Sequence, residues 1–183
     1  MTDVSERYAK LAGQMAARIA AVPEDRWDAA TPCEGWTARD LLDHLIDGPS
    51  GVFGMAGLDP IPPGPDRGAD PVAAFTHVTD AVRAGLEDPA VAGNGFDSPM
   101  GPQTFESVVS QFLSGDLVVH QWDLARATGQ DETLDPDEVR GMHAALLPMD
   151  QFLRAPGVFG PKIEPPEGAD EQMAFLCFVG RQV

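Results

Sequence analysis

The sequence predicts an all-α protein, and three observations lead to that prediction. Apolar residues recur at three- and four-residue steps along several segments, which is the period of an amphipathic helix. Runs of β-branched residues are scarce, and glycine and proline gather between the periodic segments, where turns are expected. A chain of 183 residues with 43% hydrophobic residues is long enough to bury a core, so we expect one domain over residues 1–183.

The first two predicted helices span residues 3–22 and 38–47. The first ends before Pro23, because proline cannot continue the hydrogen-bond ladder of a helix. The second follows Thr37, a residue type suited to the N-cap, and Asp40 stands three residues on as an imperfect capping-box partner, since Glu or Gln is usual there. We expect Gly48-Pro49 to end or break this second helix. The apolar stripe of the first helix consists of Val4, Tyr8, Leu11, Met15, Ile19 and Val22.

Two longer helices are predicted in the middle of the chain. Residues 58–70 are rich in proline and are expected to form a loop before a third helix over 71–86. Residues 89–103, rich in glycine and proline, form a connector that has room for a short hairpin. The fourth helix, over 105–128, is the longest, and Gly129 is a natural residue to end it.

The C-terminal part predicts two more helices. A fifth helix starts within residues 134–138, where a proline and acidic side chains suit a helix N-terminus, and Pro148 ends or kinks it. Residues 156–166 are expected to be irregular, and a short last helix covers 169–179. The whole pattern predicts a helical bundle with additional short helices and Pro/Gly-rich connectors.

Composition and charge narrow the classes of function. A formal net charge of −17 disfavours binding to nucleic acids and to anionic membrane surfaces. The N-terminal residues lack the apolar core of a secretion signal, and no apolar run approaches the length of a membrane span. Two widely separated cysteines without a CxxC spacing leave room for a single disulfide but fit a reduced cytoplasmic protein better. The sequence carries no Gly-rich phosphate loop, GxSxG elbow or Rossmann fingerprint.

Asp116 and His120 are the first candidate site residues. Their four-residue spacing places a carboxylate and an imidazole on one face of the fourth helix, on an otherwise apolar stripe. Buried polar groups need partners, and a divalent metal ion would satisfy both. His44 is the best third ligand, because its short helix must pack into the same bundle. Three protein ligands leave coordination open for water or substrate, as in catalytic zinc sites.

Simpler interpretations of the same residues stay open at this stage. Asp116 and His120 would also form an ordinary hydrogen-bonded pair on a helix. His44 would find a partner in Asp40 or Asp47, which share its face of the second helix. In either case the chain would be a purely structural helical protein.

Other polar and aromatic residues have interpretations of their own. Cys33 is expected to be a buried packing cysteine, and Asp123 with Arg126 a surface or interhelix salt bridge. His77 and His143 are expected at the surface or at its boundary. The tryptophans are expected to be packing anchors, namely Trp27, Trp36 and Trp122.

Two long motifs carry a resemblance to a known family. Residues 31–45 read TPCEGWTARDLLDHL, and residues 116–129 read DLVVHQWDLARATG. Both resemble the hallmarks of an actinobacterial family of metal-binding proteins in the DinB-like superfamily, which is related to the N-terminal domain of mycothiol-dependent maleylpyruvate isomerase. The closing residues 178–181, FVGR, resemble the usual end of that family.

The resemblance implies a DinB-like four-helix bundle with a divalent metal ion at one end. The family's two histidines and its acidic ligand fall on His44, His120 and Asp116, which is the set that the helix spacing indicates. Many superfamily members have a third histidine where this chain has Asp116, and related members have a carboxylate there. Zinc is the expected ion, with nickel as the alternative.

The resemblance also implies a class of reaction. Enzymes of the superfamily use mycothiol or bacillithiol as cosubstrate, so we expect a transferase or isomerase-like detoxification enzyme that binds a small-molecule thiol and an electrophilic substrate. The alternative is a non-catalytic metal-binding protein with a role in stress response or interaction. A homodimer is compatible with a helical bundle of this kind, although the sequence identifies no interface.

Overall fold

The computed structural model describes residues 2–98, 101–154 and 159–183, and these residues divide into two compact units. The first unit spans Met1–Gln130 and the second Asp131–Val183, and each is described by itself below. Helices dominate both units, so the predicted all-α class is confirmed. Among the described residues, no helix combines the length and the apolar character that a membrane span requires.

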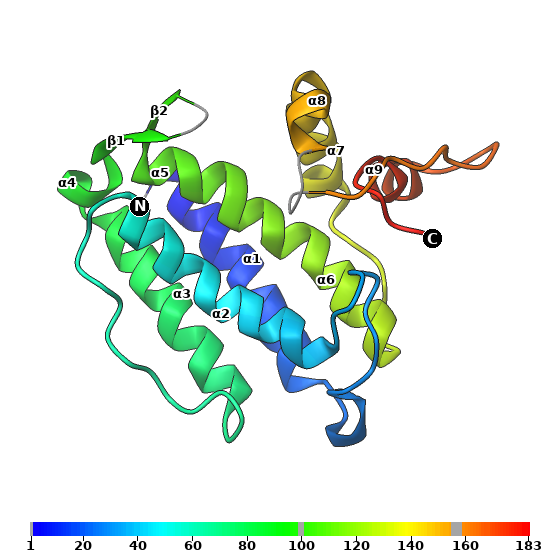
Figure 1. Cartoon of the computed structure of the whole chain (residues 1–183), viewed down its shortest axis with the longest axis horizontal. Coiled ribbons are helices and arrows are strands. Elements are labelled where there is room, and N and C mark those ends of the chain that lie inside the picture. The colour runs from blue at the N-terminus through cyan, green and yellow to red at the C-terminus, as the bar shows by residue number, and fades with distance from the viewer. Residues whose placement is uncertain (1, 99–100, 155–158) are drawn as a thin grey trace. The chain divides into compact units, whose positions relative to one another are not determined.

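The first unit is a bundle of four long helices (Figure 1). These are α1 (Asp3–Ala20), α2 (Ala38–Met55), α3 (Pro71–Glu87) and a last helix that contains α6 (Ser114–Thr128). Helix α1 packs on α3 and α6, and α2 packs on the same two helices. The four apolar faces therefore meet in one core, and α2 and α6, which carry the candidate ligands, are neighbours.

Helix α1 matches its predicted stripe closely. Thr2 caps its N-terminus by accepting a hydrogen bond from the backbone N–H of Ser5, and Ala21 follows its last residue. The stripe faces the core, where the fully buried members are Tyr8, Leu11, Met15 and Ile19. The short 3₁₀ turn η1 (Glu24–Arg26) follows the helix after Pro23.

Helix α2 begins as predicted but continues further than predicted. Thr37 and Asp40 form the complete capping box, with the side chain of Asp40 accepting from the backbone N–H of Thr37 at 2.8 Å. The prediction that Gly48-Pro49 ends or breaks the helix is wrong, since α2 runs through Pro49 to Met55. Proline within a helix costs about 3 kcal/mol. The burial of Pro49 and Val52 in the core offsets that cost, so tertiary packing overrides local propensity.

The predicted helix over 105–128 is confirmed at both ends but is not uniform. It comprises α5 (Phe105–Val108), a π-helical turn η2 (Val109–Leu113) and α6. Gly129 ends it with a φ of 75°, in the left-handed region that favours glycine. A π-helical turn holds an extra residue and is frequent at functional sites. Here it directly precedes the helix that carries Asp116 and His120.

The connectors of the first unit are partly ordered by local contacts. Helix α4 (Pro89–Ala92) leads into an antiparallel hairpin of β1 (Gly95–Ser98) and β2 (Gly101–Thr104), which confirms the predicted hairpin. Residues 99 and 100 lie outside the described part of the chain. In the proline-rich loop, Arg67 donates to Asp43 and Asp47 of α2 and so ties residues 58–70 to that helix.

The second unit is built on α7 (Pro136–Leu146) and α9 (Glu171–Phe178), which pack on each other. Gln172 joins them to the preceding loop, because its side chain accepts from the N–H of Leu134 and donates to the carbonyl of Glu132. Pro148 lies in a 3₁₀ turn, η3 (Leu147–Met149), which ends α7 as predicted and leads into α8 (Asp150–Leu153). Of the segment predicted to be irregular, residues 159–166 have no regular structure and residues 156–158 lie outside the described ones.

The contact between α3 and α5 makes Gly85 a sensitive position. A Cβ atom at Gly85 would lie 2.9 Å from Cε1 of Phe105, a ring that is fully buried. Overpacking of this kind costs about 1–3 kcal/mol, whereas alanine in place of glycine in a helix gains about 1 kcal/mol. We expect Gly85→Ala to lower the free energy of unfolding by up to about 2 kcal/mol, measured by urea denaturation.

Gly13→Ala is the matched control for that measurement. Gly13 lies on the exposed side of α1, and a Cβ atom there would meet nothing within 4 Å. This substitution should raise the free energy of unfolding by about 0.4–1 kcal/mol. Equal stabilisation by both substitutions would contradict the packing described for Gly85.

Candidate metal centre

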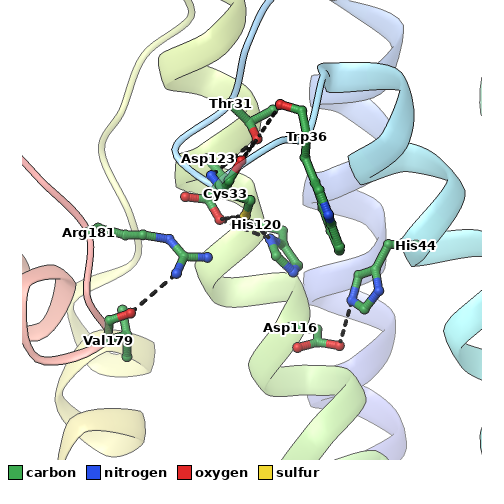
Figure 2. Close-up of polar contacts among 9 residues, drawn as sticks. All are labelled: Thr31, Cys33, Trp36, His44, Asp116, His120, Asp123, Val179 and Arg181. Atoms are coloured by element: carbon green, nitrogen blue, oxygen red, sulfur yellow. Dashed lines mark hydrogen bonds and ion pairs between the residues drawn. The ribbon is translucent and has the colours of Figure 1, made fainter. Parts of the chain in front are cut away.

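Helices α2 and α6 bring His44, Asp116 and His120 together (Figure 2). Each of the three side chains offers one ligand atom, and these atoms all lie within 4.8 Å of one another. Nε2 of His44 lies 3.2 Å from Oδ2 of Asp116, within hydrogen-bond distance across the helix interface. The arrangement follows from the fold, because α2 packs against α6 and the four-residue spacing stacks Asp116 and His120 on one face.

The exposure of these three residues differs. The side chains of His44 and Asp116 are 35% and 39% exposed, whereas that of His120 is 9% exposed. The cluster therefore has a buried inner member and two members that solvent reaches. Solvent therefore reaches the cluster on the side of His44 and Asp116.

A buried carboxylate fixes the orientation of His120. Nδ1 of His120 lies 2.9 Å from Oδ2 of Asp123, whose side chain is 0% exposed. A carboxylate only accepts hydrogen bonds, so Nδ1 carries a proton and donates a hydrogen bond to Asp123. In the neutral ring, Nε2 is then the nitrogen without a proton, which is the state that a metal ligand requires.

Cys33, in the loop before α2, also contacts Asp123 and His120. Its Sγ atom lies 3.4 Å from Oδ2 of Asp123 and 4.0 Å from Nδ1 of His120. The loop holds this position through Thr31, whose hydroxyl donates to the carbonyl of Trp36 and accepts from the N–H of Cys33. Among the described residues, Cys33, His120 and Asp123 form a second set of three grouped metal-ligand types.

These contacts correct two interpretations made from the sequence. Asp123 is fully buried against His120, so the surface form of the predicted salt bridge is wrong. Cys33 is only partly buried and contacts the carboxylate of Asp123, so its assignment as a buried packing cysteine is wrong as well. The guanidinium of Arg126 lies over the ring of Trp122, 5.4 Å from its centroid. The offset of three residues between His120 and Asp123 was the available signal, since residues three apart share a helix face.

Trp36 lies against both histidines rather than within the core. Its ring centroid is 5.0 Å from that of His44 and 6.1 Å from that of His120, and the planes of the Trp36 and His120 rings are inclined by 26°. Trp36 remains half-exposed, whereas Trp122 is buried as a packing anchor. The loop before α2 therefore supplies the aromatic wall of the cluster.

The simpler partners considered for these residues are engaged elsewhere. Asp40 completes the capping box of α2, and Asp47 accepts from Arg67 at 2.7 Å. Asp116 pairs with His44 across the helix interface, and His120 pairs with Asp123 on its own helix. The cluster thus joins two helices through its polar groups, as a metal site would require.

The donor set fits a divalent ion of the zinc type. Two imidazole nitrogens and one carboxylate oxygen are ligands that zinc and nickel accept, whereas calcium and magnesium prefer oxygen alone. Three protein donors leave at least one coordination position for an external ligand. His120 also has the buried carboxylate partner that metal-ligating histidines commonly have.

The contact between His44 and Asp116 makes the stability of the fold depend on pH. The hydrogen bond from His44 to Asp116 raises the pKa of His44, and the nearby charges of Asp116 and Asp47 also raise it, while burial lowers it. A raised pKa in the folded protein means that protonation of His44 stabilises the fold. This stability is fully present below about pH 6.5, the ordinary histidine pKa, and is lost as pH rises through the higher folded value.

We therefore expect Asp116→Asn to destabilise the metal-free protein more at pH 6 than at pH 9. The effect on the melting temperature should stay below about 4 °C, because partly exposed ion pairs contribute about 0–1 kcal/mol. Differential scanning fluorimetry in the presence of a chelator measures it. If the loss of melting temperature in Asp116→Asn were larger at pH 9 than at pH 6, Asp116 would not stabilise the protonated form of His44.

Comparison with known proteins places these residues in a family. The sequence pattern of the mycothiol maleylpyruvate isomerase N-terminal domain matches residues 8–125, a stretch that includes His44, Asp116, His120 and Asp123. The chain belongs to this family, and the resemblance seen in the two motifs is confirmed.

Two curated relatives match most of the chain. Two uncharacterized proteins of Mycobacterium tuberculosis, one from each of two strains, are 33% identical over 168 residues. The match covers 88% of this chain and 90% of each relative. No solved structure matches the chain.

Proposed function

We propose that this protein binds one divalent metal ion, zinc or alternatively nickel, through His44, Asp116 and His120. The grouping of their three ligand atoms within 4.8 Å of one another is the observation that carries the proposal. The fit of the donor set and the support of His120 by Asp123 add to it. The carboxylate of Asp116 would offset part of the charge of the ion at its more exposed side.

We further propose that the site serves a thiol-dependent transferase or isomerase-like detoxification reaction, with mycothiol as cosubstrate. The family's name refers to mycothiol, and an open coordination position suits a small thiol. A bound divalent ion supplies Lewis acidity, which lowers the pKa of a coordinated thiol so that thiolate is available near neutral pH. A cytoplasmic location, where thiols stay reduced, belongs to the same proposal.

The residues of the chain would divide the remaining tasks. Asp123 holds His120 in one tautomer and one orientation. Trp36 lies against the two imidazole rings and limits water on that side of the cluster. The more exposed side chains of His44 and Asp116 mark the side from which the thiol and the electrophile would enter.

A conjugation assay tests this function directly. The zinc-loaded protein is mixed with mycothiol and 1-chloro-2,4-dinitrobenzene; a carbon–sulfur bond forms, chloride leaves and the thiol proton passes to solvent. We expect turnover above the uncatalysed rate that is lost on chelation and in His120→Ala. Stoichiometric zinc without turnover across a panel of electrophiles would instead support the non-catalytic metal-binding alternative.

A further inference from the structure

We propose that Asp123 and Cys33 are positioning residues, which together set the tautomer, orientation and metal affinity of His120. This inference rests on the proposed function of His44, Asp116 and His120 as metal ligands. Neither Asp123 nor Cys33 needs to touch the ion. They act on it through the imidazole ring of His120.

One carboxylate oxygen of Asp123 contacts both His120 and Cys33. Oδ2 of Asp123 accepts from Nδ1 of His120 at 2.9 Å and from Sγ of Cys33 at 3.4 Å. Asp123 is fully buried, and a buried carboxylate is costly unless hydrogen bonds stabilise it. Its place beside a candidate ligand therefore indicates a specific role, because a neutral residue of similar size would avoid this cost.

The two donors come from different parts of the fold. His120 and Asp123 lie on α6, whereas Cys33 lies in the loop that precedes α2. That loop is closed by a bridge between Ala30 and Thr37, and it also presents Trp36 to the histidine rings. The position of the loop and the orientation of His120 are therefore linked through Asp123.

A thiol is well suited to this place. The S–H group is a weak donor, so it helps to hold the carboxylate while leaving most of its negative charge to the imidazole. A carboxylate partner increases the basicity of a ligating histidine and fixes its tautomer. A hydroxyl at the same position would lie further from the carboxylate, because a C–O bond is shorter than a C–S bond, and would replace the thiol only in part.

The test measures zinc affinity by competition with a chromophoric chelator in the full chain and its variants. Residues that hydrogen-bond to a metal ligand contribute about 10- to 100-fold in metal affinity. Asp123→Ala should therefore weaken zinc binding by that factor, and Asp123→Asn should weaken it by less. Cys33→Ala should weaken it about 2- to 10-fold, as expected for one weak hydrogen bond, with Cys33→Ser between wild type and Cys33→Ala. Cys177→Ser, at the buried second thiol, is the matched control and should leave affinity unchanged.

A second measurement separates positioning from a merely structural role. Nitrogen NMR of the metal-free protein reports the tautomer of His120, which should be the Nδ1–H form in wild type and a mixture in Asp123→Ala. The metal-free variant must keep its helical circular dichroism for this comparison, and Asp123→Asn serves if Asp123→Ala does not fold. An unchanged tautomer together with unchanged zinc affinity would overturn the proposal.

The same proteins loaded with cobalt(II) separate the remaining possibilities. An intense near-ultraviolet sulfur-to-cobalt band that disappears in Cys33→Ser would show that Cys33 is itself a ligand, which overturns its positioning role. Spectra without that band, together with weaker zinc binding in the Asp123 and Cys33 variants, support the positioning role of Cys33. If wild type binds no zinc or cobalt, the proposed function fails, whereas the tautomer measurement still tests the contact of Asp123 with His120.

Discussion

Zinc affinity should fall by more than 100-fold when His120 is replaced by alanine. His120 is the inner and most buried of the three proposed ligands, and Asp123 already holds its ring through Nδ1, which leaves Nε2 for the ion. Changes around a ligand cost about 10- to 100-fold in affinity, so loss of the ligand itself should exceed that range. Competition titration of the purified protein at neutral pH, with a chelator of known zinc affinity, gives the two dissociation constants.

His143→Ala is the control for the loss of a histidine. His143 lies on α7 in the second unit, where its ring lies near those of Phe175 and Phe178. Its replacement should leave zinc affinity within about twofold of wild type, which corresponds to less than 0.5 kcal/mol. Equal affinities in wild type and His120→Ala would contradict the assignment of His120 as a ligand.

Zinc should also stabilise the folded protein strongly. The proposed ligands come from α2 and α6, so an ion bound between them would favour the folded state over the unfolded chain, where they are separated. At a free zinc concentration 100 times the dissociation constant, the stabilisation is about 2.7 kcal/mol. For a chain of this length that is a rise of roughly 5–11 °C in melting temperature.

Scanning calorimetry with zinc and with a chelator measures this rise in wild type and in three variants. His44→Ala removes a ligand on α2 and Asp116→Ala one on α6, so both should melt at temperatures that depend much less on zinc. Gly13→Ala, on the exposed side of α1, should keep the full rise. A rise of the same size in all four proteins would mean that zinc acts elsewhere on the chain.

The fold was largely predictable because most of its information is local. The stripe of α1, the capping box of α2 and the left-handed Gly129 are all set by residues close to one another in sequence. The continuation of α2 through Pro49 was not predictable, because it depends on the burial of Pro49 and Val52 against other helices. The π-helical turn at Val109–Leu113 left no signal in the spacing of apolar residues.

Part of the candidate site was also predictable from the sequence, and part was not. The pairing of Asp116 with His120 on one helix face followed from a four-residue spacing, and His44 followed from the need of its helix to pack in the bundle. The role of Cys33 could not be derived, because it depends on how a loop distant in sequence folds against α6. Asp123 was within reach of the same periodicity, but its burial depends on the packed structure.

Elemental analysis of untagged protein, prepared without chelators, shows whether His44, Asp116 and His120 hold a metal ion. His44→Ala and His120→Ala, purified in parallel, complete the experiment. We expect about one zinc or nickel ion per chain in wild type and a large loss in both variants. Wild-type protein without metal, or variants that retain the full amount, would contradict a metal centre at His44, Asp116 and His120.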